Sequence, residues 1–288
     1  MQPPVMEFVH ETESEAVFLV DYGSLEPAAT LGLRWIAEQL GQALGRAVAP
    51  VSLRHSDAAP VALLGGRPAE VLDSALESRA RQGVNQFVIV PLFFGPSGAL
   101  TGDVPACVAR VRAKFPAIEV RLARCLVDVK DEADDRMAAM LEDQVRARIS
   151  SAGPRPAVIL VDHGSPERAV TLVRDHLAAR LASRLGDLVT GVRAASMERR
   201  PGAEFDFNEP SLARALNESN PGATPVVVAM QFLLPGRHAG PDGDIARICE
   251  AACRRNPGLS VEMTDLVGSH PKLIEVLADR ARSVLHFF

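Results

Sequence analysis

The chain has 288 residues, which is enough for one large domain or for two domains of ordinary size. Its 47% hydrophobic and 23% charged residues exclude a largely disordered or fibrous protein, and its net charge of −5 argues against a nucleic-acid binder that depends on bulk electrostatic attraction. No apolar run approaches the roughly 18 residues of a membrane span, and the segment before Ala16 carries no export-signal pattern, so we predict a cytoplasmic protein that binds no membrane.

Along the chain, short apolar runs alternate with longer segments whose apolar residues recur at helical spacing. In the first half, strand-like runs lie near residues 16–21, 48–53, 86–92 and 118–123. In the second half, they lie near 157–162, 188–195, 224–231 and 259–264, and helical patterns follow at 166–185, 209–219, 243–255 and 271–284. Continuously apolar runs are typical of strands covered on both faces, and the alternation predicts parallel sheets with helical crossovers.

The two halves are copies of one design. Three blocks recur in the same order, at offsets of 139 to 141 positions: AVFLVDYGSLEP and AVILVDHGSPER at 16–27 and 157–168, QFVIVPLFFGPSGA and PVVVAMQFLLPGRHA at 86–99 and 225–239, and GDVPACVARV and GDIARICEAA at 102–111 and 243–252. The join lies near SSAGPRP, a small-residue and proline stretch typical of linkers. We therefore predict an α/β fold of two duplicated, doubly wound parallel-sheet domains, at 1–150 and 151–288.

Two histidines of the second copy follow strands that should be neighbours. If the strand order is 2-1-3-4, ligands bind beyond the carboxyl ends of the first and third strands. His163 comes directly after the first strand and His238 just past the third, so we expect them to face each other. Imidazole binds divalent metals and exchanges a proton near neutral pH. The alternative for His163 is a plain strand-to-helix turn, with Ser165 as the cap and Pro166 at the first helical position.

The first copy lacks both imidazoles. Tyr22 stands in place of His163 and Ala99 in place of His238, while the glycine-serine turn remains. This pattern predicts a first domain that kept the fold and lost the chemistry. It also indicates that the two histidines work as a unit.

The second copy resembles the sirohydrochlorin chelatases, the CbiX/SirB group of the ATP-independent class II chelatases. The resemblance spans the whole chain as a tandem form, strongly in the second copy and weakly in the first. These motifs carry it: His163-Gly164-Ser165, Met197-Glu198, Glu209-Pro210-Ser211-Leu212, His238 followed by Asp244-Ile245, and Gly268-Ser269-His270-Pro271. One unusual feature is EFDFNE at 204–209, an acidic and aromatic insertion before Pro210.

By this resemblance the protein is a lyase that inserts a divalent metal into sirohydrochlorin, in cobalamin or siroheme biosynthesis. The metal is a substrate, cobalt or ferrous iron, and imidazole would accept nickel as well. No organic cofactor is implied, and no glycine-rich phosphate-binding motif is present. The partners are a tetrapyrrole and a metal ion, without nucleic acid, and the oligomeric state stays open between a monomer and a homo-oligomer.

The resemblance also implies roles for individual residues. His163 and His238 would hold the metal or accept the pyrrole protons. Glu198 is either a third ligand or proton acceptor, or a solvated carboxylate beside Arg199 and Arg200. The tetrapyrrole is a polycarboxylate, so Arg237 is the candidate clamp, with Arg199 and Arg200 as weaker ones. Gly164 and Ser165 are expected to contact the substrate at the turn.

Two other interpretations remain open at this stage. The first is a non-catalytic tetrapyrrole- or metal-binding protein of the same fold. The second is a two-domain binder that uses the cleft between its domains. Cys249 and Cys253 are four residues apart on an expected helix and could share a metal, but we predict buried helical cysteines.

Overall fold

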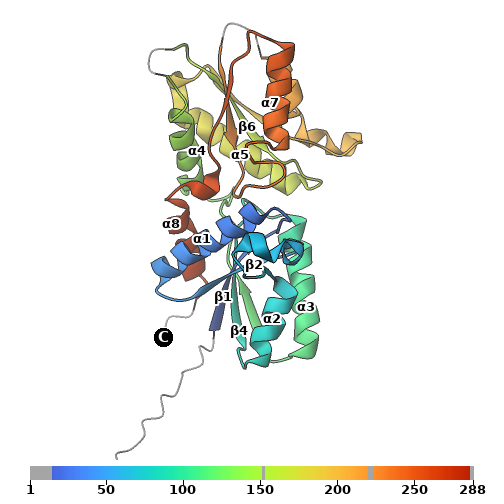
Figure 1. Ribbon diagram of the computed structural model, residues 1–288. Coiled ribbons are helices and arrows are strands. Elements are labelled where there is room, and N and C mark those ends of the chain that lie inside the picture. Colours follow the sequence, from blue (N-terminus) through green and yellow to red (C-terminus); the bar gives the residue numbers. More distant parts are fainter. Residues whose placement is uncertain (1–14, 151–152, 220–223, 286–288) are drawn as a thin grey trace, which may run out of the picture.

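The computed structural model describes residues 15–150, 153–219 and 224–285, which form two α/β domains stacked end to end (Figure 1). The first half of the chain contains β1 (Glu15–Asp21), α1 (Pro27–Leu44), β2 (Val48–Ser52), β3 (Glu70–Val71), α2 (Leu72–Arg81), β4 (Gln86–Pro91), α3 (Val104–Lys114), β5 (Glu119–Leu122) and α4 (Arg136–Arg146). The second half contains β6 (Ala157–Asp162), α5 (Arg168–Leu185), β7 (Gly191–Ser196), α6 (Leu212–Asn217), β8 (Val226–Met230), α7 (Asp244–Arg255), β9 (Val261–Met263) and α8 (Leu273–Arg282). None of the helices in the described ranges has the length and apolarity that a membrane crossing requires.

Both sheets are parallel throughout, as predicted. The first has the strand order β3-β2-β1-β4-β5 and the second has β7-β6-β8-β9, so the expected 2-1-3-4 order is confirmed in each half. The two-residue strand β3 extends the first sheet and was not expected, because two residues carry no periodic pattern. Strand β7 begins at Gly191, later than the expected residue 188, because Gly186–Leu188 form a short 3₁₀ turn.

Local sequence accounts for the main elements. Val158 to Val161 of β6 are all at most 3% exposed, as continuous apolar strands covered on both faces should be. Helix α1 begins at Pro27, whose missing N–H is not needed in the first turn. It ends before Gly45, which adopts the left-handed conformation (φ 68°) that closes a helix.

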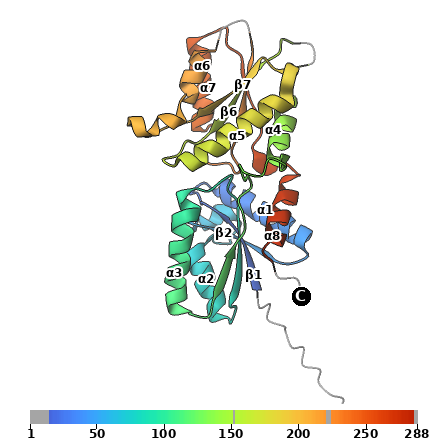
Figure 2. The ribbon, with the colours of Figure 1, turned by 180° about the vertical axis from the view of Figure 1, so that it is seen from behind.

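The two halves exchange their last helices. Helix α4 of the first copy packs against α5 and β8 of the second sheet, and α8 of the second copy packs against α1 and β4 of the first sheet. In Figures 1 and 2, α8 accordingly lies beside α1 and α4 beside α5. A single apolar core therefore runs through both domains and includes Leu19, Val90, Leu160 and Val227. Each folded domain therefore consists of one sequence repeat without its own last helix, together with the last helix of the other repeat.

The carboxyl ends of the two sheets point toward each other. In Figure 1, β1 runs up toward the second domain and β6 runs down toward the first. The loops after β1 and β8 come close, since a Cβ built on Gly236 would lie 3.8 Å from Ser24 Oγ. Ser24 lies two residues after Tyr22, and Gly236 lies two residues before His238. The strand ends of the first domain are thus neighbours of the predicted site in the second.

Candidate functional site

His163 and His238 face each other at the carboxyl ends of β6 and β8. Their ring centroids are 4.8 Å apart and the ring planes meet at 72°. The side chain of His163 is 47% exposed and that of His238 is 31% exposed, so solutes can reach both. The predicted juxtaposition of the two imidazoles is confirmed.

Each imidazole is held through Nδ1. The Nδ1 atom of His163 is 3.0 Å from the carbonyl oxygen of Gly164, and Nδ1 of His238 is 2.6 Å from Oδ2 of Asp244. Both partners accept hydrogen bonds, so Nδ1–H donates in each case and Nε2 carries the lone pair. Held this way, an imidazole can bind a metal or take up a proton at Nε2.

The segment between β8 and α7 places His238. The N–H of Asp244 donates to the carbonyl of Arg237 at 3.3 Å, and that of Ile245 donates to the carbonyl of His238 at 3.2 Å. Ile245 is fully buried, which fixes the start of α7 in the core. The bond from His238 also holds the pKa of Asp244 below its usual range. The Asp-Ile pair after the histidine therefore positions the ring and keeps a carboxylate beneath it.

The turn between β6 and α5 places His163. Asp162 lies beneath it, and its Oδ1 accepts from Gly164 N at 3.1 Å and from Ser196 Oγ at 2.7 Å. Gly164 has φ 89°, and a Cβ there would lie 2.0 Å from the carbonyl oxygen of Glu198. Only glycine fits this conformation and this close approach. The turn therefore requires Gly164 for its geometry.

The expected helix start at this turn is wrong. Pro166 is not the first helical residue, since α5 begins at Arg168. Ser165 does not cap the helix, because its Oγ accepts from Glu167 N at 3.0 Å, which closes a local turn before the helix. The turn between His163 and α5 is therefore two residues longer than expected.

Asn208 holds this turn and was not identified from the sequence. Its side chain accepts from Ser165 N at 3.1 Å and from Thr171 Oγ1 at 3.2 Å, and it donates to Ser165 O at 2.8 Å. The residue is 1% exposed and closes the short helical turn Ala203–Asn208 within the EFDFNE insertion. The insertion therefore contributes a buried amide to the His163 turn. Nothing in the spacing of the motifs indicated this contact.

A buried arginine supports the same turn. Arg174 of α5 is 2% exposed and donates to Ser196 Oγ at 2.5 Å and to Asn208 O at 3.3 Å. Its guanidinium lies 3.9 Å from Oδ1 of Asp162. The sequence did not predict the burial of Arg174, because a single arginine within a helical pattern does not indicate which way its side chain turns.

Glu198 reaches the histidine pair, whereas Arg199 does not. Glu198 follows β7, is 61% exposed, and places Oε1 3.6 Å from Nε2 of His163. Arg199 turns to the insertion, where it pairs with Asp206 at 2.6 Å and Glu209 at 3.0 Å. These carboxylates occupy its guanidinium, which disfavours Arg199 as a substrate clamp. Arg200 lies over the ring of Phe205, 6.0 Å from the centroid.

Arg237 remains available for an anion. Its side chain is 78% exposed, and its Nε lies 3.8 Å from Oδ2 of Asp244, too far for a hydrogen bond. It stands next to His238 on the same loop. The position is compatible with the predicted clamp, which stays a prediction.

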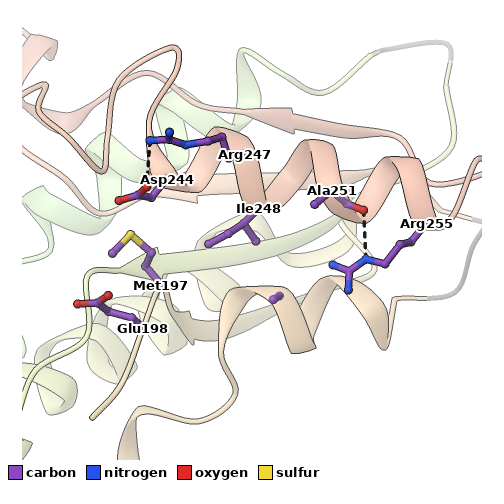
Figure 3. A pocket seen from close by; sticks show the side chains of 8 residues that line it. Met197, Glu198, Asp244, Arg247, Ile248, Ala251 and Arg255 are labelled. Carbon is purple, nitrogen blue, oxygen red and sulfur yellow. Dashed lines mark hydrogen bonds and ion pairs between the residues drawn. The ribbon is translucent and has the colours of Figure 1, made fainter.

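A cavity of about 450 Å³ adjoins the site between α6 and α7 (Figure 3). Its lining residues are Met197, Glu198, Ala213, Asp244, Arg247, Ile248, Ala251 and Arg255. The carboxylates of Glu198 and Asp244 lie at one end and Arg255 at the other, where its Nε donates to Ala251 O at 3.1 Å. Neither histidine lines this cavity, so it lies beside the paired imidazoles and does not contain them.

No ready-made cluster of three or more His, Cys, Asp or Glu ligands occurs among the described residues. His163 and His238 form one candidate metal site. Cys249 and Cys253 do not form a second one, because Cys249 is buried in the core and burial raises the pKa of its thiol to about 12. The prediction of buried helical cysteine is confirmed for Cys249, and Cys253 is half-buried against the same core.

Asp21 is the first-domain counterpart of Asp162, but the position that corresponds to Arg174 holds no arginine in the first domain. Leu33 of α1 stands at the position that Arg174 has in α5, and it is 1% exposed. Oδ1 of Asp21 has no hydrogen-bond partner among the described residues. Burial raises the pKa of Asp21 to about 6.

Replacing Asp21 by asparagine is expected to stabilise the protein at neutral pH. Because the folded-state pKa of about 6 lies above the ordinary value of 3.8, the unfolded chain loses this proton first. The free energy of unfolding therefore falls as pH rises from 3.8 to about 6, and the full loss of stability applies above that range. Asp21→Asn should gain up to about 3 kcal/mol at neutral pH and little near pH 4. Urea unfolding at both pH values measures this, and an equal gain at both would contradict it. Asp57→Asn, at an exposed carboxylate of the same domain, is the control and should give no such gain.

Comparisons with known proteins show the same fold. The chain is similar to SirB from Bacillus subtilis in its structure with Fe³⁺, with 16% identity, a TM-score of 0.68, and coverage of 93% of this chain and 94% of that one. It is similar to the sirohydrochlorin chelatase SirB from Bacillus subtilis subspecies spizizenii in complex with cobalt, with 17% identity, a TM-score of 0.67 and the same coverage. It is also similar to CbiX, the terminal enzyme for biosynthesis of siroheme in denitrifying bacteria, with 14% identity, a TM-score of 0.59, and coverage of 94% and 99%.

At these identities the solved structures establish the fold. No curated protein sequence matches the chain. The family model described as CbiX matches residues 16–148 and, a second time, residues 157–284. These two matches cover most of the chain and follow the internal duplication, so the chain belongs to the CbiX family.

Proposed function

We propose that the protein inserts a divalent metal ion, cobalt or ferrous iron, into sirohydrochlorin at the paired histidines of its second domain. One observation carries the proposal. His163 and His238 meet at the carboxyl ends of β6 and β8 with each Nδ1 held by an acceptor, which leaves both Nε2 atoms for the reaction. Family membership and the fold of the SirB and CbiX structures support the choice of reaction.

The reaction makes two demands that these side chains meet. A metal ion must shed water and pass to the ring nitrogens, and two pyrrole protons must leave the macrocycle. Neutral imidazole nitrogen is a good ligand for cobalt and iron, and it binds reversibly enough to release them. The same nitrogen accepts a proton once the metal has passed on. The two histidines can thus hold the metal first and take the protons afterwards.

Neighbouring carboxylates complete the proposed site. Glu198 Oε1 lies 3.6 Å from His163 Nε2, so it can join as a ligand or relay a proton from that imidazole to solvent. Asp244, bonded to His238 at 2.6 Å, stabilises the imidazolium that forms when this ring is protonated. Gly164 and Ser165 follow His163 directly and would contact the substrate there, and Arg237, next to His238, would pair with a carboxylate of the tetrapyrrole.

An absorbance assay tests the proposal. Purified protein is mixed anaerobically with sirohydrochlorin and with Co²⁺, Fe²⁺ or Ni²⁺ in turn, and the change of the macrocycle spectrum is followed against a protein-free control. Turnover with at least one metal, well above the uncatalysed rate, is expected. Stoichiometric binding of the tetrapyrrole without turnover would overturn the proposal and favour a non-catalytic binding protein of the same family.

Asn208→Ala is expected to slow metal insertion about tenfold or more, because the buried amide makes two hydrogen bonds to Ser165 of the His163 turn and one to Thr171 of α5. Asn217→Ala, which removes an exposed amide at the end of α6, is the control and should leave the rate unchanged. Steady-state rates with circular dichroism spectra measure the effect. A folded Asn208→Ala variant with the wild-type rate would show that the insertion does not position His163.

A further inference from the structure

The strand ends of the first domain carry Tyr22, Arg54 and Asp103. This cluster stands at the positions that form the proposed metal site in the second domain. The register pairs Asp21 with Ser52 in the first sheet and Asp162 with Ser196 in the second. Two residues beyond each serine stand Arg54 and Glu198, respectively. The backbone repeats this match, since Arg54 N donates to Tyr22 O at 3.0 Å and Glu198 N donates to His163 O at 3.2 Å. Arg54 therefore occupies the place of Glu198.

A second equivalence completes the comparison. Asp103 precedes α3 in the block GDV, as Asp244 begins α7 in the block GDI, 141 positions later. In the second domain Asp244 binds His238, but in the first domain the position of that histidine holds Ala99. Asp103 instead pairs with Arg54, NH2 to Oδ1, at 2.7 Å. An ion pair thus spans the place where the second domain has its imidazoles.

These replacements reverse the charge preference of the site. The second domain offers two imidazole lone pairs and a carboxylate, which attract a cation. The first offers the guanidinium of Arg54 and the phenol of Tyr22, which donate hydrogen bonds and favour an anion such as a carboxylate. His55 lies beside Tyr22, with ring centroids 6.0 Å apart.

Arg54 is free to exchange its partner. Its side chain is 49% exposed and that of Asp103 is 36% exposed. Ion pairs this exposed contribute little to stability, so a carboxylate from solution can replace Asp103 at the guanidinium. Bidentate binding by arginine would favour this replacement.

The cluster also lies toward the second domain. The carboxyl ends of β1 and β6 point toward each other (Figures 1 and 2), and the Tyr22 and His238 loops come together at Ser24 and Gly236. A ligand held at His163 and His238 that extends toward the first domain would meet Arg54. A polycarboxylate macrocycle has anionic groups on every edge.

We propose that Arg54 of the first domain binds a carboxylate of the tetrapyrrole, in place of Asp103, while the second domain handles the metal. This inference rests on the proposed function, since it concerns the substrate of that same reaction. The first domain is then a substrate-binding half, in which a guanidinium has replaced the metal-facing carboxylate.

Equilibrium binding of metal-free sirohydrochlorin, followed anaerobically by absorbance, tests the inference with two opposite expectations. Arg54→Gln should raise the Kd about tenfold, the loss of one charge-assisted contact. Asp103→Asn should lower the Kd about threefold, because it removes the internal competitor for the guanidinium. A merely structural ion pair would weaken binding in both variants or in neither. Arg110→Gln is the control, since Arg110 pairs with Asp73 between α3 and α2 and should leave the Kd unchanged.

The outcomes separate this inference from the proposed function. Equal Kd values for Arg54→Gln and wild type, or an Asp103→Asn variant that binds no tighter than wild type, would overturn the inference alone. Failure of the wild-type protein to bind sirohydrochlorin would overturn the proposed function. Co²⁺ binding, measured without tetrapyrrole, should be the same in Arg54→Gln and wild type, and a loss of Co²⁺ affinity would place Arg54 in the metal site and overturn the inference.

Discussion

Alanine in place of His163 or His238 is expected to reduce the rate of metal insertion at least about a hundredfold, the usual contribution of a positioned proton acceptor. Each substitution removes one of two imidazoles whose ring centroids lie 4.8 Å apart. The double variant should be little slower than either single variant, because groups that act as a unit are not additive. Both rings are partly exposed, so the fold should survive.

Steady-state rates with each metal, together with circular dichroism spectra, measure this effect. His176→Ala is the matched control, because it removes an imidazole from α5 that has no partner in the site. An active double variant would show that the chemistry lies elsewhere and would make the first domain its candidate host.

Replacing Arg280 by methionine is expected to destabilise the whole protein by about 3 kcal/mol or more, since it breaks a buried charge network. Arg280 of α8 is 2% exposed, and it donates to the carbonyl oxygens of Cys125 and Leu126 at 3.0 and 3.1 Å and to Asp134 at 2.5 Å. These three partners belong to the first half of the chain, so the contact attaches the exchanged helix. Methionine keeps most of the volume and removes only the charge and the donors.

Urea unfolding of Arg280→Met at neutral pH measures the loss, and Arg282→Met is the control. Arg282 donates to Ala43 O at 2.9 Å from an exposed position, so its replacement should cost less than about 1 kcal/mol. The difference in free energy of unfolding between the two variants should become smaller in acid. Bonds from Arg136 and Arg280 hold the pKa of Asp134 well below its ordinary value of 3.8, so this stabilisation is complete above pH 3.8 and is lost as pH falls further. Equal stability of both variants at neutral pH would contradict the prediction.

Repetition and periodicity predicted most of the fold. Continuous apolar runs identified the four main strands of each sheet, and the 2-1-3-4 order that was assumed for them is the order observed. The exchange of α4 and α8 could not be predicted in this way. An amphipathic helix shows which of its faces is buried, but an apolar face fits either of two similar sheets. The choice depends on particular contacts, such as those of Arg280, that no pattern records.

The histidine pair was predictable because topology fixes where strand ends meet. Its supports were not, since they depend on side-chain reach. Asn208 approaches the His163 turn from an insertion 43 residues later in the sequence, and Arg174 turns inward from a helix. The sequence makes Arg199 a weaker candidate for the substrate clamp, yet the nearby carboxylates of Asp206 and Glu209 bind it. Sequence alone did not indicate which of the many arginines is occupied.

The exchanged helices make each half of the chain incomplete by itself. A polypeptide ending near residue 150 would leave the sheet face beneath α8 bare, while its own α4 would have no sheet to cover. A single-copy protein built on this plan would have to obtain the missing helix from a second molecule, as in a domain-swapped dimer. The tandem chain joins the two partners covalently, so assembly no longer depends on protein concentration. That linkage also lets the two copies diverge, because a one-chain pair need not be symmetric.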